Sequence, residues 1–200
     1  MAKKDKAWQI ESIAEELRDL DQSPLYNYRK ENDYLSVPGT GDPNARIMFI
    51  GESPGKKEAQ SGEPFVGRAG RFLDQLLESI ELDRADVYIT NVVKDRPPGN
   101  RDPYQVEIET YAPLLEQEIN IVQPQVFATL GRFAMNVILG KYAHPKQGKK
   151  IGDLHGKKLE VETCYGNVAF VPLYHPAAAF YNRDLYKTMQ DDFKRLKLST

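Results

Sequence analysis

Four short apolar segments constrain the fold of this chain more than any other feature. They occupy residues 45–51, 86–93, 125–131 and 167–175, and the first of them reads ARIMFIG. Continuous apolar runs of this length, bounded by turn residues, are typical of strands buried on both faces of a parallel sheet. Helical patterns separate the segments, as the crossover connections of a parallel sheet require. The sequence therefore predicts an α/β fold.

The segments between these strands carry apolar residues at helical spacing. Helices are expected over about residues 6–20, 72–80, 102–121 and 133–139, and a last helix is expected from Asn182 or Asp184 to about Lys197. The third should begin with Asp102 as N-cap, Pro103 at the first position and Gln105 at the third. Residues 23–44 show no sustained period and are expected to form a long loop. Residues 158–163 are expected to pair with the last strand as a hairpin.

Composition limits which kinds of site and which cellular location are expected for the protein. The chain has 200 residues, a net charge of −2 and a single cysteine, Cys164, which excludes an internal disulfide and a metal site built on several thiolates. The N-terminal segment is charged and amphipathic, so neither a signal peptide nor a membrane span is expected. We expect one domain over residues 1–200, a monomer, a cytoplasmic location and no membrane partner. Local basic clusters, at 141–158 and around Lys94, can still attract a polyanion.

The carboxyl ends of the predicted strands carry polar or glycine residues. Gly51, Glu52 and Ser53 follow the first strand, whereas Asn91 and His175 end the second and fourth. In parallel sheets, ligands bind beyond the carboxyl ends of the strands, which lie along one edge. The pattern therefore predicts that an acid, an amide and an imidazole meet at one site.

Two common site types do not fit the stretch GESPGKKE at residues 51–58. A phosphate-binding P-loop needs four residues between its glycines and a hydroxyl after its lysine, but Gly51 and Gly55 are one residue too close and Lys57 occupies the hydroxyl position. Ser53 does not lie in the G-x-S-x-G turn of a hydrolase nucleophile. Nucleotide hydrolysis and serine hydrolysis are both disfavoured.

Four motifs in order resemble the uracil-DNA glycosylases of family 4. They are GESPGKKE, GEPFVGRAGRFLDQLL, YITNVVKDRPPGNRDP and YHPAAAF, and the resemblance extends over about residues 17–197. It implies a three-layer α/β/α sandwich with a central, mostly parallel four-stranded sheet. It also implies a monofunctional enzyme that flips uracil out of single- or double-stranded DNA and hydrolyses its glycosidic bond.

The resemblance implies a role for each residue at the strand ends. Phe65 matches the aromatic that stacks on uracil, and Asn91 matches the amide that reads its edge, with Gly51 beside them. His175 matches the donor to uracil O2. Glu52 matches the glutamate of the family's G-E-A-P-G loop, where it could orient water, stabilise the cationic sugar or brace the loop. Ser53 stands where alanine is usual, and its hydroxyl either positions water or has no effect.

Loops around these residues resemble the family's DNA-facing loops. The DNA-binding residues implied are Arg68, Lys94, Arg96, Asn100, Arg101, Phe180, Tyr181 and Arg183. Phe180 or Tyr181 could wedge into the base stack, or both could pack on the last helix. The backbone amides of residues 67–70, which open a helix, could bind a phosphate.

The iron–sulfur cluster usual in this family is expected to be absent. Its four cysteine positions fall at Leu20, Ser23, Asp95 and Tyr111, and none of them is cysteine. The tie between the N-terminal segment and the loop after Asn91 must then come from packing and hydrogen bonds, with Tyr26, Tyr28 and Tyr111 as candidates. Two alternatives to uracil excision stay open: excision of a modified pyrimidine, and DNA binding with weak catalysis or none.

Overall fold

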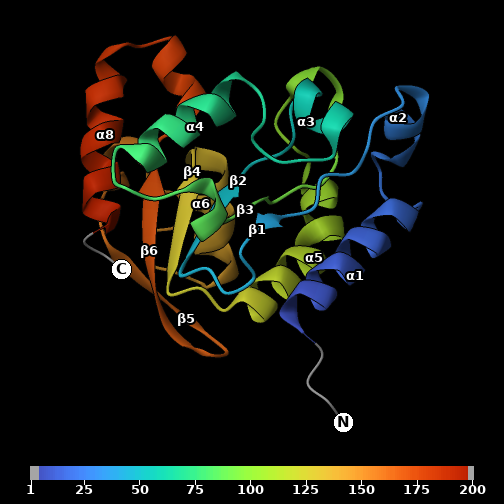
Figure 1. The fold of residues 1–200 in the computed structure, drawn as a ribbon, viewed down its shortest axis with the longest axis horizontal. Helices are drawn as coiled ribbons and strands as arrows, with labels where there is room; N and C mark the ends of the chain where they lie inside the picture. Colours follow the sequence, from blue (N-terminus) through green and yellow to red (C-terminus); the bar gives the residue numbers. More distant parts are fainter. Residues whose placement is uncertain (1–4, 198–200) are drawn as a thin grey trace.

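The protein is a three-layer sandwich in which helices cover both faces of a central sheet (Figure 1). This computed structural model describes residues 5–197. Residues 1–4 and 198–200 lie outside the described part. The expected single domain over residues 1–200 includes both of these ends, and the charged N-terminal segment includes residues 1–4.

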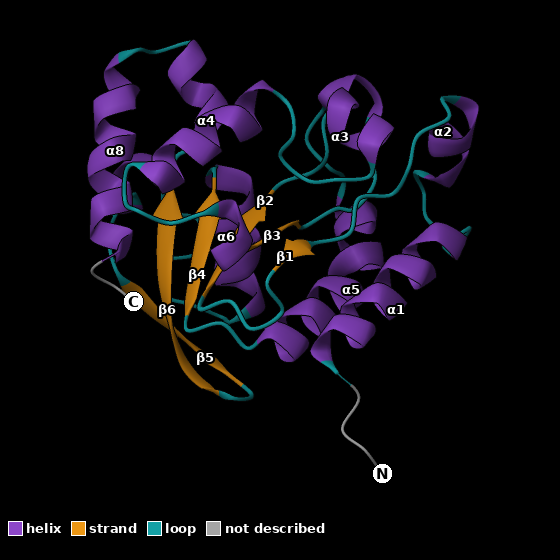
Figure 2. Cartoon of the chain, viewed as in Figure 1, coloured by secondary structure: helices purple, strands orange, loops and turns teal. Residues whose placement is uncertain are grey.

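The sheet has six strands in the order β1-β3-β2-β4-β6-β5 (Figure 2). The strands are β1 (Thr40–Gly41), β2 (Ile47–Gly51), β3 (Tyr88–Asn91), β4 (Val126–Leu130), β5 (Leu159–Thr163) and β6 (Gly166–Leu173). β3, β2, β4 and β6 are parallel, and they are the four strands that the apolar segments predict. β1 and β5 add antiparallel edges. The α/β class is confirmed, and β5 is the expected hairpin partner of the last strand. The predicted strands did not include β1.

Eight helices lie within the described part of the chain. They are α1 (Lys6–Asp19), α2 (Tyr26–Glu31), α3 (Lys56–Ser61), α4 (Arg68–Glu78), α5 (Gln105–Val122), α6 (Arg132–Lys141), α7 (Ile151–Leu154) and α8 (Asp184–Lys197). Three short 3₁₀ helices accompany them: η1 (Arg84–Asp86), η2 (Pro98–Asn100) and η3 (Pro176–Phe180). Over residues 5–197, no helix combines the length and the apolar character that crossing a bilayer demands.

Each face of the sheet has its own apolar core. On one face, residues of α1, α5 and α6 pack on alternate strand residues such as Met48 and Phe127. On the other face, α4 and α8 pack on the intervening residues, such as Phe49 and Ala128. Because successive strand residues point to opposite faces, a strand covered on both sides must be apolar throughout. All five residues of β2 are accordingly buried.

Two local expectations were wrong. Residues 23–44 contain α2 and β1 in addition to loop. α5 begins two residues later than expected, because the Glu107 carboxylate accepts the Tyr104 backbone N–H at 2.8 Å and Tyr104 is the N-cap. The expected first helix is confirmed as α1, whose buried residues are Ile13 and Leu17.

A buried hydrogen-bond network ties the N-terminal segment to the loop after β3. The Tyr111 hydroxyl donates to Asp95 Oδ2 at 2.7 Å and shares a short hydrogen bond with Ser23 Oγ. Arg29 Nη1 lies 3.3 Å from Asp95 Oδ1 and also donates to the Leu17 carbonyl at 3.0 Å. All four of the polar side chains in this network are at most 6% exposed. The network therefore links α1, α2, α5 and the β3 loop through polar groups.

Replacement of Tyr111 by Phe should destabilise the protein. The hydroxyl that bridges Ser23 and Asp95 would be lost, and a buried carboxylate oxygen would be left without that partner. Such a loss costs about 1–3 kcal/mol, and each kcal/mol lowers Tm by about 2–4 °C for a domain of this size. Thermal unfolding followed by circular dichroism measures the change. Tyr181→Phe, at a side chain 91% exposed, is the matched control and should leave Tm unchanged; equal Tm values for both variants would contradict the role of the network.

Candidate active site

The register of the parallel strands brings the polar strand ends together. Gly51 at the end of β2 is paired with Asn91 at the end of β3. The pairing continues past both strands, because Val92 and Val93 donate their N–H groups to the carbonyls of Gly51 and Glu52 at 3.0 Å each. Leu130 in β4 is similarly paired with Leu173 in β6, which places the Gly131 turn against His175.

These strand ends surround one cavity of about 370 Å³. Its lining residues are Glu52, Ser53, Pro54, Gly55, Glu58, Phe65, Ala69, Asn91, Asn100, His175 and Ala177. The structure thus brings together Glu52, Ser53, Phe65, Asn91 and His175, the five side chains that the sequence indicates for base binding and catalysis. A cavity of this volume with a few converging polar groups is the usual form of a small-ligand site.

Asn91 is the most informative of these residues. Its side chain is 1% exposed, and its Oδ1 is a buried oxygen with no hydrogen-bond partner among the described residues. Such an atom costs free energy unless a ligand or water supplies a donor. A Cβ on Gly51 would lie 2.3 Å from Oδ1 and 2.6 Å from the Phe65 ring, so only glycine leaves the amide room at this position.

Phe65 is held in an unusual conformation at the cavity. Its φ is +53°, a left-handed value that is uncommon for an aromatic residue. Arg84 donates to its carbonyl at 3.2 Å, and Gly70 lies so close that a Cβ there would be 1.6 Å from the same oxygen. Its ring faces the His175 ring with centroids 5.9 Å apart. Backbone strain of this kind is typical of functional sites, where it holds a side chain in place.

The tautomer of His175 follows from its contacts. Its Nδ1 accepts the backbone N–H of Ala177 at 3.1 Å, and burial lowers the pKa of His175 to about 4. The ring is therefore neutral near pH 7, and its single proton lies on Nε2. Neutral His175 can donate a hydrogen bond from Nε2 to an oxygen in the cavity.

Glu52 also lines the cavity, and the pKa of its carboxyl is raised. Burial, with the nearby Asp102 carboxylate, raises the pKa of Glu52 to about 7, although Arg132 opposes the shift. Asp102 and Arg132 form an ion pair with Nη2–Oδ2 of 2.7 Å. Glu52 is thus ionised in about half of the molecules near neutral pH and can accept a proton or hold a water. Sequence reasoning missed Asp102 and Arg132 in this role, because they are fifty and eighty positions from Glu52 in the chain.

Glu58 is a further residue of the cavity that sequence reasoning missed. It is the third residue of α3, but its Oε1 accepts the N–H of Gly67, the N-cap of α4, at 2.8 Å. This carboxylate occupies part of the helix terminus that was expected to bind a phosphate. Its position three residues after the N-cap Gly55 would suggest a cap on its own helix, so no local pattern indicated the contact with Gly67.

Lys94 was wrongly assigned to the DNA-binding residues. Its side chain is 0% exposed, and Nζ lies 2.6 Å from Glu118 Oε2 inside the core. Arg101 pairs with Glu107 at 2.6 Å, and it stabilises the start of α5. Arg96 is half-buried and donates to Asn100 Oδ1 at 2.7 Å and to Tyr34. The cluster that reads as basic in the sequence is therefore largely neutralised or buried.

The remaining residues assigned to DNA binding lie around the cavity mouth. Asn100 lines the cavity itself. Arg68, Phe180 and Arg183 line a second, adjacent groove. Tyr181 projects into solvent and is 91% exposed. Phe180 packs under Arg68 and against Phe72, so of the two aromatics proposed as a wedge only Tyr181 is free of such packing.

The residues at the four positions that match the family's cluster cysteines do not fit as ligands of an iron–sulfur cluster. Ser23, Asp95 and Tyr111 offer hydroxyl and carboxylate oxygens that bond to one another, whereas such clusters are held by thiolates. Cys164 is exposed and bonds to Asn120. Among residues 5–197, no group of three or more His, Cys, Asp or Glu side chains is placed to hold a metal ion.

Comparisons with known proteins agree with the geometry of this site. A family model described as "Uracil DNA glycosylase superfamily" matches residues 38–197. The chain is 40% identical over 189 residues to a Type-4 uracil-DNA glycosylase of Sulfurisphaera tokodaii, covering 94% of this chain and 83% of that protein. A protein of the same name from Saccharolobus solfataricus is 40% identical over 94% of this chain and 85% of its own length. Another, from Archaeoglobus fulgidus, is 43% identical over 80% and 79%.

The acidity of Glu52 should respond to its charged neighbours in opposite directions. Asp102→Asn removes a negative charge and should lower the pKa of Glu52 below about 7, whereas Arg132→Gln should raise it. Carboxyl-carbon NMR titration at low ionic strength, with the signal assigned by Glu52→Gln, measures both shifts. Asp191→Asn, which removes a carboxylate paired with Lys194, is the control. A Glu52 pKa that stays constant in both variants would refute this electrostatic coupling.

Proposed function

We propose, because the chain belongs to the uracil DNA glycosylase superfamily, that it excises uracil from DNA as a step of DNA repair. The reaction is hydrolysis of the N-glycosidic bond between uracil and deoxyribose, which leaves an abasic site. The protein is thus a hydrolase that acts on a base held outside the stack.

The observation that carries this function is the buried, unpartnered Oδ1 of Asn91. Uracil presents an N3–H donor beside the O4 acceptor, so one amide can accept from N3–H through Oδ1 and donate to O4 through Nδ2. Cytosine presents the reverse pattern at these atoms. An amide oxygen buried without a donor therefore selects a base that brings one.

His175 stabilises the departing base. As the glycosidic bond breaks, negative charge develops on uracil O2, and an N–H aimed at that oxygen stabilises the transition state more than the ground state. Neutral His175, with its proton on Nε2, is such a donor. Phe65 lies beside it and offers an aromatic face on which the flipped base stacks.

Glu52 and Ser53 serve the sugar side of the reaction. The deoxyribose gains cationic character as uracil leaves, and an ionised carboxylate stabilises that charge or orients the attacking water. The Ser53 hydroxyl lines the same cavity and can donate or accept one hydrogen bond to this water. No part of this scheme needs a metal ion or a redox group.

We extend the proposal to the setting of the enzyme. It works without a resident cluster, because the network at Ser23, Asp95 and Tyr111 performs the structural tie. It acts as a monomer of one domain, in the cytoplasm, on uracil in single- or double-stranded DNA. The hydrogen bonds among Ser23, Asp95 and Tyr111 support the first of these properties.

Loss of the base-reading or donating group should abolish most excision. Asn91→Asp and His175→Ala should each lower the single-turnover rate by about 10²–10³-fold, since each removes a group that acts on the transition state. Alkali-labile cleavage of uracil-containing oligonucleotides measures the rate, and His144→Ala at a surface histidine is the matched control.

The cleavage assay, together with a binding measurement on the same oligonucleotides, separates the alternatives. Release of a 5-substituted uracil in preference to uracil would favour a modified pyrimidine as the substrate. Binding of uracil-containing DNA with no base release by the wild type would show a binding protein instead and would overturn the enzymatic proposal.

The rate of excision should rise with pH through about 7. The pKa of Glu52 is raised to about 7, so its ionised fraction falls about tenfold between pH 8 and pH 6. His175, with a pKa lowered to about 4, stays neutral throughout and adds no second limb. Single-turnover rates over this interval measure the profile. The Glu52→Gln enzyme should excise uracil more slowly, at a rate that does not change with pH. If the rate of the Glu52→Gln enzyme still rises with pH, a group other than Glu52 causes the rise.

A further inference from the structure

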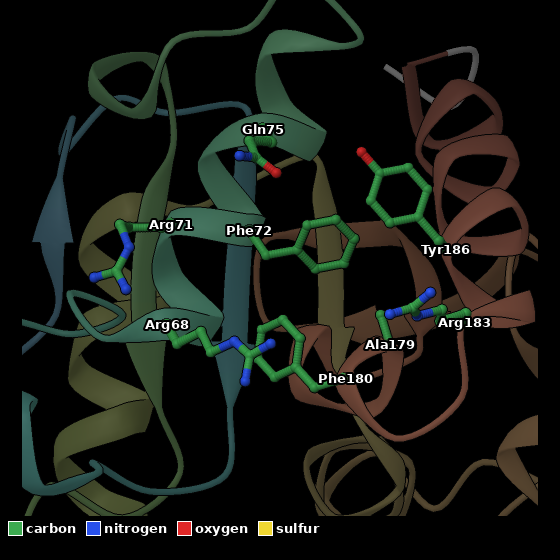
Figure 3. Close-up of a pocket in the computed structure, with 8 residues that line it drawn as sticks. All are labelled: Arg68, Arg71, Phe72, Gln75, Ala179, Phe180, Arg183 and Tyr186. Atoms are coloured by element: carbon green, nitrogen blue, oxygen red, sulfur yellow. The ribbon is translucent and has the colours of Figure 1, made fainter.

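A second groove lies beside the active-site cavity, between α4, η3 and the start of α8 (Figure 3). Its volume is about 740 Å³, larger than that of the base cavity. The side chains that line it come from two chemical classes, cationic and aromatic, with one amide and one alanine. They are Arg68, Arg71, Phe72, Gln75, Ala179, Phe180, Arg183 and Tyr186.

The aromatic side chains form a connected set. Phe72 stacks on Tyr186 with ring centroids 5.0 Å apart, and Phe180 lies 6.1 Å from Phe72 in a tilted arrangement. Figure 3 shows the Phe72 ring between the other two. Phe72 is buried, whereas Tyr186 is 44% exposed. An aromatic side chain supported from behind and open in front is suited to receive another planar ring.

The cationic side chains have no acidic partners. Within the described part of the chain, no carboxylate lines the groove, and Arg68, Arg71 and Arg183 form no ion pair. The Arg68 guanidinium lies over the Phe180 ring, with Cζ 3.9 Å from the ring centroid. Other arginines of the protein are neutralised internally, such as Arg29 and Arg101. Three unpaired guanidinium groups around one groove favour an anionic ligand, and their planar geometry suits phosphate.

The groove adjoins the base cavity through two shared elements. On α4, Ala69 lines the base cavity, whereas Arg68 and Phe72 line the groove. On η3, Ala177 lines the cavity and Ala179 the groove. Three helical residues span about 5 Å along an axis, which is of the order of the step between neighbouring nucleotides in a strand. A ligand in the groove can therefore be covalently continuous with a base in the cavity.

We propose that this groove is a binding subsite for an unpaired nucleotide next to the flipped uracil on the same DNA strand. Its base stacks on Tyr186 above Phe72, and the phosphate that joins it to the uridine lies between Arg68 and Arg183. This inference rests on the proposed function, because it takes uracil in the cavity as the reference point. It adds a second base-recognition site that tolerates any base, since every base has a flat face.

The subsite favours single-stranded substrate. A base stacked in the groove has left the duplex stack, so in double-stranded DNA the enzyme must open a second pair in addition to the one that contains uracil. In a single strand the same base is already unpaired.

Fluorescence of 2-aminopurine tests the proposal, because stacking quenches this base. Short single-stranded oligonucleotides carry 2′-fluoro-2′-deoxyuridine, whose glycosidic bond resists hydrolysis, with 2-aminopurine at the 5′ neighbour, at the 3′ neighbour or at a distant position. The full-length protein should quench the probe at one neighbour and leave the distant probe unchanged.

The variants assign this quenching to the groove. Tyr186→Ala should abolish it and weaken binding about tenfold. Arg183→Ala should weaken binding several-fold and reduce the slope of log affinity against log salt by about one. Lys187→Ala, an exposed cation on the same helix that does not line the groove, is the matched control and should do neither.

The outcomes separate this inference from the proposed function. Two results would overturn the subsite, whether or not uracil is excised. One is that the Tyr186→Ala protein quenches the neighbouring probe as the wild type does. The other is that the Arg183→Ala and Lys187→Ala proteins bind with the same affinity and the same salt dependence. Neighbour quenching that depends on Tyr186 supports the subsite even if oligonucleotides with ordinary uracil are never cleaved. A groove that binds an acidic peptide instead would give no quenching at either neighbour and would also refute the proposal.

Discussion

The parallel pairing of β2 with β3 is the constraint on which the site depends. It aligns Gly51 with Asn91 and continues beyond them through two backbone hydrogen bonds, from Val92 to Gly51 and from Val93 to Glu52. A shift of one residue would turn the Asn91 side chain from the cavity to the opposite face of the sheet, because side chains alternate along a strand. The apolar cores on both faces oppose such a shift, so the packing that stabilises the fold also positions the amide.

Burial in the same cavity moves two titratable groups in opposite directions. It lowers the pKa of His175 and raises the pKa of Glu52, since it disfavours the charged form of each. Near neutral pH, the imidazole is therefore a neutral donor and the carboxyl is poised between its two forms. Burial thus makes His175 a neutral donor for the leaving base and Glu52 a carboxyl that ionises near neutral pH at the sugar. The difference between their pKa values assigns each residue its role.

The strand ends and the residues of the cavity could be predicted from the sequence because local patterns encode them. Apolar runs identified the four parallel strands, and motifs placed Phe65, Asn91 and His175. Lys94 was misassigned because its partner Glu118 lies 24 positions away, and no local pattern reveals a buried ion pair at that separation. Asp102, Arg132 and the groove residue Tyr186 were missed for the same reason, as only tertiary packing brings them to the site. α5 begins two residues later than expected, because the capping box of Tyr104 and Glu107 outweighs the preference of Asp102 and Pro103 for an earlier start.

The network of Ser23, Arg29, Asp95 and Tyr111 bears on how the protein is made. A tie built from side-chain hydrogen bonds is complete as soon as the chain has folded, and it draws on no supply of iron or sulfide. Oxidants that dismantle metal clusters have no target in hydroxyl, carboxylate and guanidinium groups. The contacts that hold the N-terminal segment to the loop after β3 are therefore the same under oxidising and reducing conditions.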